Sequence, residues 1–150
     1  MNEQDYLLGI DVGSTTVKVA IMDQVGESLY SEYRRHFARI QETLAEVLRR
    51  ASEKLGSVPV LPAITGSGGM ALAQAMKIPF VQEVIAVSES LDRRYPQTDV
   101  AIELGGEDAK ILYLTGGRDQ RMNGICAGGT GSFIDQMAAL LGTDAEGLNE

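Results

Sequence analysis

Two stretches of this chain repeat one pattern, and the repetition restricts the fold more than any other feature. Residues 8–21 and 100–114 each have alternating apolar residues, then a glycine turn, then alternating apolar residues again. Alternation of this kind predicts two strands joined by a tight turn. Each stretch also has an acid before its turn and a lysine after it. The pattern indicates an internal duplication at about half the length of the chain.

The first turn has the composition of a phosphate-binding loop. Gly13 can adopt a positive φ and lets the backbone approach a ligand closely. The hydroxyls and backbone N–H groups that follow can surround an anion, and Asp11 at the strand end is placed to hold Mg²⁺ through water. Lys18 adds a positive charge. The residues expected to face phosphate are Gly13, Ser14, Thr15 and Thr16.

A plain hairpin with polar turn residues would explain the first turn equally well if it stood alone. It is not a Gly-Lys-Ser/Thr loop, because a strand pattern and not a helix pattern follows it. The second turn has the same arrangement, with Glu103 before Gly105 and Gly106, and Lys110 after them. Its acids could be simple turn residues, but two similar turns favour a site that holds a phosphate chain from two sides.

Helices and further strands are expected between and after the repeats. The apolar spacing predicts a helix over 37–55 that ends at Gly56, with His36 as a surface or capping residue at its start. Pro59 and Pro62 lie inside the strand expected at 58–65 and suggest either a sheet-edge position or a late start of that strand. The other expected elements are strands at 6–12, 16–23, 28–33, 58–65 and 119–125 and helices at 70–76, 83–94 and 132–141.

Composition excludes several classes of function. The net charge of −8 argues against nucleic acid as a partner, because phosphate backbones are bound by clustered lysine and arginine. It does not argue against ATP, whose site uses local donors and a metal. No apolar run approaches a membrane span, and the N-terminus lacks a signal peptide's pattern. A single cysteine rules out an internal disulfide framework, so a cytoplasmic protein is expected.

A glycine loop with the only cysteine leads into the last expected helix. Thr130 or Ser132 can cap this helix, and Asp135 stands where a capping box would have its acid. Cys126 lies just before the helix start, where backbone N–H groups favour a thiolate. The alternatives are a small buried cysteine and a helix entry without a ligand. No closing element is expected after residue 141, which suggests part of a longer protein.

Together these residues resemble the actin, hexokinase and heat-shock chaperone ATPase superfamily. Within it, three stretches are similar to the ATPase activators of 2-hydroxyacyl-CoA dehydratases and to the ATPase subunits of benzoyl-CoA reductase. They are Gly-Ile-Asp-Val-Gly-Ser-Thr-Thr-Val-Lys at 9–18, Leu-Gly-Gly-Glu-Asp-Ala-Lys at 104–110 and Cys-Ala-Gly-Gly-Thr-Gly-Ser-Phe at 126–133. The first is shared across the superfamily, whereas the cysteine followed by a glycine loop is much more specific.

The resemblance implies an α/β chain with the actin-like ATPase (ribonuclease H-like) fold. Its mixed sheets would contain the duplicated strand-turn-strand-strand units, flanked by helices. Residues 1–97 would form a first domain with one phosphate loop. Residues 98–150 would form the first part of a second domain with the other phosphate loop and the cysteine loop.

The resemblance also implies a function, that of a one-electron-transfer ATPase acting as an ATP-dependent activator. Hydrolysis would drive a low-potential electron from a [4Fe-4S] cluster to an iron–sulfur acyl-CoA dehydratase or reductase. A homodimer would hold the cluster between its subunits. Cys126 would be one ligand, and a second cysteine would lie outside this chain.

The site residues follow from the same resemblance. Asp11 and Glu103 would hold hydrated Mg²⁺, and Glu103 would also orient the attacking water. The residues expected to contact ATP or ADP are Gly13, Ser14, Thr15, Thr16, Lys18, Gly105, Gly106, Gly128, Gly129 and Thr130.

The second loop departs from the family's usual Asp-Ile-Gly-Gly-Gln-Asp pattern. Glu103 replaces the first aspartate and reaches metal-bound water with a longer arm. Glu107 replaces the glutamine and adds negative charge near the phosphates, which should weaken nucleotide binding unless the metal compensates.

Two other functions fit the same fold. A small-molecule kinase would use an aspartate base and have no use for Cys126, and a sugar-binding signature between the loops would favour it. A regulatory module that binds nucleotide and hydrolyses it slowly would suit Glu107 and the altered second loop. Fold alone does not separate these functions, because function depends on the site.

Overall fold

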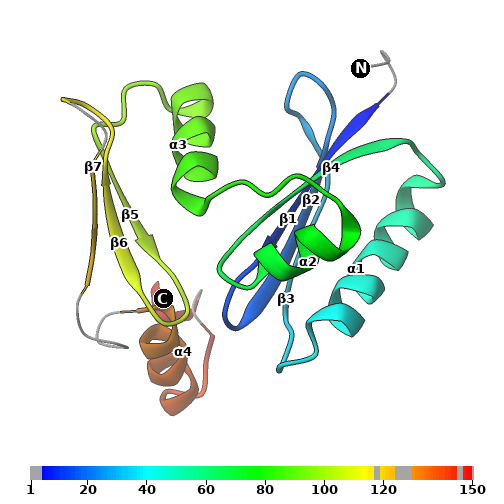
Figure 1. Ribbon diagram of the computed structural model, residues 1–150. Coiled ribbons are helices and arrows are strands. Elements are labelled where there is room, and N and C mark those ends of the chain that lie inside the picture. Colours follow the sequence, from blue (N-terminus) through cyan, green and yellow to red (C-terminus); the bar gives the residue numbers. More distant parts are fainter. Residues whose placement is uncertain (1–4, 117–118, 124–129, 145–146, 150) are drawn as a thin grey trace. The chain divides into compact units, whose positions relative to one another are not determined.

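The computed structural model describes residues 5–116, 119–123, 130–144 and 147–149. The chain divides into two compact units, Met1–Glu83 and Val84–Glu150, and each has its own sheet (Figure 1). The division falls at the start of α3 (Glu83–Arg94), so this helix is counted with the second unit. The sequence analysis places it in the first domain, and the boundary after residue 97 stays a prediction.

The first unit is built on a mixed sheet with the strand order β3-β2-β1-β4. β1 (Tyr6–Val12), β2 (Thr16–Met22) and β3 (Ser28–Arg35) form an antiparallel meander. β4 (Val60–Thr65) pairs in parallel with β1, ends the order of the sheet and starts after Pro59, in agreement with both alternatives expected from the prolines. On its outer side Ile64 makes an isolated parallel bridge to Phe80.

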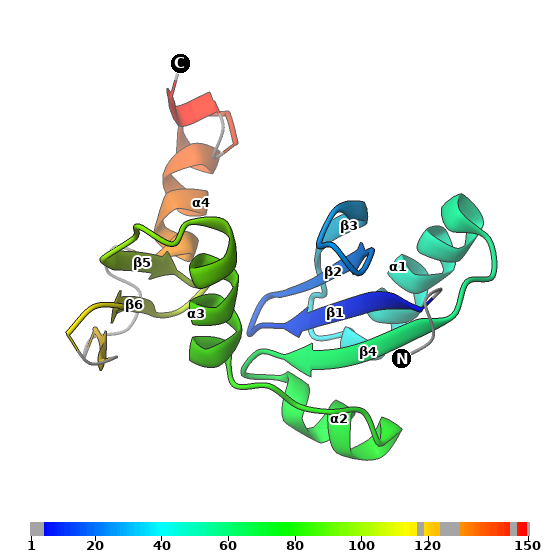
Figure 2. The ribbon, with the colours of Figure 1, turned by 90° about the horizontal axis from the view of Figure 1, so that it is seen from above.

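The core of this unit lies between the sheet and α1 (Ile40–Leu55). Alternate residues of β1 and β2 share one face because the side-chain period of a strand is two. The helix packs against β2 and β3, while α2 (Gly69–Met76) packs against β4 (Figures 1 and 2). The buried residues that these elements contribute are Leu8, Ile10, Val12, Val17, Val19, Ile21, Leu44, Val47, Ala51, Ile64 and Ala73.

Helix α1 begins three residues later than the sequence predicts. Phe37 and Ala38 have φ values of 46° and 63°, in the left-handed region, so they cannot continue a right-handed helix. Phe37 is exposed and belongs to the turn that joins β3 to α1. The helix ends at Leu55, before Gly56 with φ 77°, as the glycine predicts.

A network of charged side chains also ties β3 to α1. Arg34 lies 2.8 Å from Glu32 and 3.0 Å from Glu46, and Arg50 lies 2.8 Å from Glu46. The Tyr30 hydroxyl donates a hydrogen bond to Glu32. The pKa of Tyr30 is raised to about 12, mainly because the hydroxyl is buried and secondly because of this hydrogen bond. These contacts fix the end of β3 that leads toward the first glycine turn.

The second unit repeats the antiparallel meander. β5 (Val100–Leu104), β6 (Ala109–Tyr113) and β7 (Asp119–Met122) form a sheet in the order β5-β6-β7, which confirms the internal duplication. α4 (Gly131–Leu140) and a short 3₁₀ turn, Gly147–Asn149, follow it. Leu112 and Ala138 are its buried apolar residues within the described part of the chain.

The two faces of this second sheet differ. Lys110 and Leu112 on β6 are buried, whereas Val100, Ile102 and Leu104 alternate along β5 and are exposed. β5 is also an edge strand. Among the helices in the described residues, none has the length and apolar character needed to cross a membrane.

Candidate functional site

The first glycine turn is a tight connection between β1 and β2. The Gly13 N–H donates to the Thr16 carbonyl at 2.9 Å, which leaves Ser14 exposed and Thr15 partly exposed at the tip. Gly13 does not adopt a positive φ, and an added Cβ would lie 3.6 Å from Thr16, an ordinary contact. The turn itself therefore does not require glycine, and the contact of Gly13 with phosphate stays a prediction.

His36 contacts the backbone of this turn, a structural role that the sequence analysis missed. Its side chain is buried, with 5% of its surface exposed. Its Nε2 lies 3.2 Å from the Gly13 carbonyl oxygen, and its backbone N–H donates to the Thr15 carbonyl at 3.1 Å. The Ala38 N–H donates to Nδ1. The expectation of a surface or capping histidine is wrong, because β3 extends to Arg35 and delivers His36 beneath the turn.

Asp11 and Lys18 form a cross-strand pair close to the turn of this hairpin. They face each other in the register of β1 and β2, and Lys18 Nζ lies 2.8 Å from Asp11 Oδ2. The other oxygen, Asp11 Oδ1, is buried and has no hydrogen-bond partner among the described residues. The lysine therefore neutralises one side of the carboxylate, while the other side is buried against the loop after β4.

The loop after β4 approaches this carboxylate closely. Gly66 has φ 97°, and an added Cβ would lie 2.3 Å from the Val12 carbonyl oxygen and 2.6 Å from Asp11 Oδ1. The Gly68 N–H donates to the same Val12 carbonyl at 2.8 Å. The sequence analysis does not assign this stretch to the site. The available signal was a glycine loop at the carboxyl end of a strand parallel to β1, since ligands bind at that edge of α/β sheets.

The second hairpin repeats the acid–lysine arrangement in the second unit. Glu103 and Lys110 face each other across β5 and β6, and Lys110 Nζ lies 3.3 Å from Glu103 Oε1 and 3.2 Å from Asp108 Oδ2. Glu103 Oε2 is buried without a partner in the described part of the chain. At Gly105 an added Cβ would lie 2.3 Å from Asp108 Oδ1, so the Asp108 side chain would have to move to make room. Glu107 is exposed at the turn.

The start of α4 is joined to this second turn. The Gly131 N–H donates to the Gly105 carbonyl at 2.7 Å, and the Ser132 N–H and hydroxyl both donate to the Gly106 carbonyl. Thr130 is fully buried and is the N-cap residue. The capping box expected at Ser132 is therefore wrong, because Ser132 lies inside the helix. Cys126, Gly128 and Gly129 lie outside the described residues.

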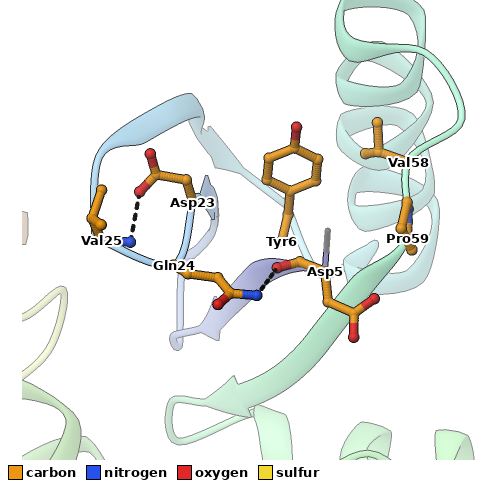
Figure 3. Close-up of a pocket in the computed structure, with 7 residues that line it drawn as sticks. All are labelled: Asp5, Tyr6, Asp23, Gln24, Val25, Val58 and Pro59. Atoms are coloured by element: carbon orange, nitrogen blue, oxygen red, sulfur yellow. Dashed lines mark hydrogen bonds between the residues drawn. The ribbon is translucent and has the colours of Figure 1, made fainter. Parts of the chain in front are cut away.

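A separate hollow of about 540 Å³ lies at the opposite end of the β1–β2 hairpin from the first turn (Figure 3). Its polar groups take part in local contacts. The Val25 N–H donates to Asp23 Oδ1 at 3.0 Å, and the Gln24 side chain donates to the Asp5 carbonyl at 3.4 Å. No residue predicted for the nucleotide site lines this hollow, so it is not part of the candidate site.

The two meanders and their hairpins define the actin-like ATPase fold class, as the resemblance implied. A solved structure has the same architecture, that of the activator of the 2-hydroxyisocaproyl-CoA dehydratase from Clostridium difficile with bound ADPNP. The TM-score is 0.74 at 26% identity, over 93% of this chain and 53% of that one.

The chain belongs to the BadF/BadG/BcrA/BcrD ATPase family, whose model matches residues 8–150. The 2-hydroxyisocaproyl-CoA dehydratase activator of Clostridioides difficile is 32% identical, over 95% of this chain and 55% of the relative. The (R)-2-hydroxyglutaryl-CoA dehydratase activating ATPase of Acidaminococcus fermentans is 30% identical, over 97% of this chain and 57% of the relative. The chain thus spans little more than half the length of these curated relatives.

Proposed function

We propose that this chain binds and hydrolyses ATP as part of an activator of a 2-hydroxyacyl-CoA dehydratase or a related iron–sulfur acyl-CoA reductase. The observation that carries the proposal is the acid–lysine hairpin present in both units, whose carboxylate keeps one buried oxygen unpartnered among the described residues. The names of the relatives supply the class of partner.

Hydrated Mg²⁺ fits these carboxylates. A buried anionic oxygen without a donor is costly, and a metal-bound water would supply that donor. Within the described residues, no group of three or more His, Cys, Asp or Glu is gathered to hold a metal ion. We propose that the cation is held mainly by water and phosphate, with Asp11 and Glu103 as water-mediated ligands. When bound, Mg²⁺ neutralises phosphate charge.

The remaining site residues position the nucleotide. In this proposal residues 13–16 and Gly105 and Gly106 lie against the phosphate oxygens, and Lys18 adds positive charge. Glu103 orients the attacking water. Gly128, Gly129 and Thr130 contribute further contacts, an assignment that rests on the family resemblance.

Electron transfer is the second part of the proposed function, beside ATP hydrolysis. Cys126 ligates a [4Fe-4S] cluster, which supplies a low-potential electron when present. The other ligands are a second cysteine from outside residues 1–150 and the same pair from the other subunit of a homodimer. This assignment also rests on the resemblance.

The ATPase part is tested with Asp11→Asn in the purified protein. We expect the rate of ATP hydrolysis to fall by about 100-fold or more, because the metal's water shell loses an anionic partner. The matched control is Asp23→Asn, at the opposite end of the hairpin, which keeps the acceptor for the Val25 and Glu27 N–H groups. A parent that binds ATP without hydrolysing it would support the regulatory module instead. Transfer of phosphate to a small acceptor would support the kinase.

The electron-transfer part is tested by anaerobic iron–sulfide reconstitution of the full-length protein and its Cys126→Ala variant. Iron content and the reduced-state EPR spectrum are measured for both. We expect a cluster in the parent and its loss in the variant. A cluster in neither protein, or in both, would remove Cys126 from electron transfer.

A further inference from the structure

In the described part of the chain, the Thr65 hydroxyl oxygen is buried without a hydrogen-bond partner, and the proposed function gives it no role. Among the described residues, three side-chain oxygens are buried without a hydrogen-bond partner: Asp11 Oδ1, Thr65 Oγ1 and Glu103 Oε2. Such atoms are rare in folded proteins, and each calls for an explanation such as an ordered water or an ion. Two of the three lie in the first unit.

Those two oxygens come from adjacent positions on neighbouring strands. Asp11 on β1 and Thr65 on β4 are partners in the parallel register, at the last residue of β4. Partners in register have side chains on the same face of a sheet. Thr65 is thus beside the carboxylate whose other oxygen is already held by Lys18.

The backbone fixes Thr65 in this place from both sides. Gly66 lies against Val12 and Asp11 so closely that a Cβ could not fit, and Gly68 donates to the Val12 carbonyl. On the other side of β4, the Ile64 N–H donates to the Pro79 carbonyl at 2.9 Å, and the Val81 N–H donates to the Ile64 carbonyl at 2.8 Å. These contacts hold the backbone of Thr65 beside Asp11.

We propose that Thr65 is a further cation-site residue, whose hydroxyl and Asp11 Oδ1 together hold a water of the hydrated divalent cation. A carboxylate oxygen only accepts hydrogen bonds, while a threonine hydroxyl both donates and accepts. A water bound to Mg²⁺ donates two hydrogen bonds and so satisfies both atoms. The proposal rests on the proposed function and adds a residue that positions the cation.

The test compares Thr65→Val, which keeps the shape and removes the hydroxyl, with Thr65→Ser, which keeps the hydroxyl. The ADP affinity of the full-length protein and of each variant is measured by calorimetry, first with MgCl₂ and then with EDTA. We expect Thr65→Val to weaken ADP binding by about three- to tenfold in Mg²⁺, as for one lost hydrogen bond, and to leave it unchanged in EDTA. Thr65→Ser should bind like the parent.

Two further measurements keep the outcomes separate. Thr43→Val, in α1, is the control for replacing a threonine elsewhere in the same unit, and thermal unfolding checks that each variant folds. An equal loss with and without Mg²⁺ would mean that the hydroxyl meets phosphate or has only a structural role, and would overturn the proposal. Unchanged affinity in Thr65→Val would overturn it too. A parent that does not bind ADP would instead refute the proposed function.

Discussion

His36 shows how one side chain can shape a binding loop without facing the ligand. Its ring contacts the Gly13 carbonyl, and its backbone N–H binds the Thr15 carbonyl, so both sides of the turn tip are fastened to the end of β3. The carbonyls are thereby turned toward the protein. His36 therefore helps to fix the backbone of the turn in which the phosphate contacts are proposed.

Replacement of this histidine should loosen the turn. We expect His36→Ala to lower the free energy of unfolding by about 1–3 kcal/mol, since the Gly13 carbonyl loses its partner and a buried side chain is removed. ADP affinity should fall as well. Denaturant unfolding and calorimetry measure the two effects, with the exposed Arg39→Ala as the control. An ADP affinity equal to that of the parent would show that the turn does not depend on His36.

At the scale of elements, the hairpins are held in place by loops that follow other elements. The loop after β4 contacts the first hairpin through Gly66 and Gly68, and the start of α4 contacts the second through Gly131 and Ser132. In both contacts a glycine packs against a backbone carbonyl of the hairpin. Glycine is required because a Cβ at Gly66 would clash with the Val12 carbonyl oxygen, and a Cβ at Gly131 would clash with the Gly105 carbonyl oxygen.

The stability of a Gly66→Ala variant measures how tightly this loop packs against β1. We expect Gly66→Ala to lower the free energy of unfolding by more than about 2 kcal/mol, because a left-handed φ costs about 1–2 kcal/mol and the Cβ also displaces the loop. Gly26→Ala is the matched control, with φ 92° and nothing within 4 Å of the added Cβ. Equal losses in the two variants, measured by chemical denaturation, would argue against a tight contact between the loop and β1.

At the scale of the whole molecule, the two units differ in how fully their sheets are covered. The first sheet has α1 and α2 packed against it. In the second, alternate residues of edge strand β5 are apolar and exposed, with Ile102 at 68%. An exposed apolar edge strand is a template for pairing with another chain.

The purified chain of residues 1–150 should therefore associate with itself. We expect Ile102→Lys to shift it toward the monomer in sedimentation velocity, because a charge on the edge strand opposes pairing. Val25→Lys, at an exposed apolar residue in the β2–β3 turn, is the control and should change nothing. Association that is unaffected by Ile102→Lys would place the contact elsewhere.

Sequence alone determined the elements and the duplication, because strand alternation, helix spacing and glycine turns are local properties. Every expected strand and helix in the described residues is present, with errors at ends such as Phe37 and Ala38, where the backbone turns left-handed. The three motif stretches also identified the family, which the match over residues 8–150 confirms.

Only the tertiary structure decided which groups meet. The burial of His36, the position of Thr65 beside Asp11, the approach of Gly66 and the use of Ser132 against the second turn all depend on which strand ends lie side by side. These residues are far apart in the chain, and their spacing has no period that predicts the contact. Pairing of strands across long separations is a property of the folded sheet, so it is seen only there.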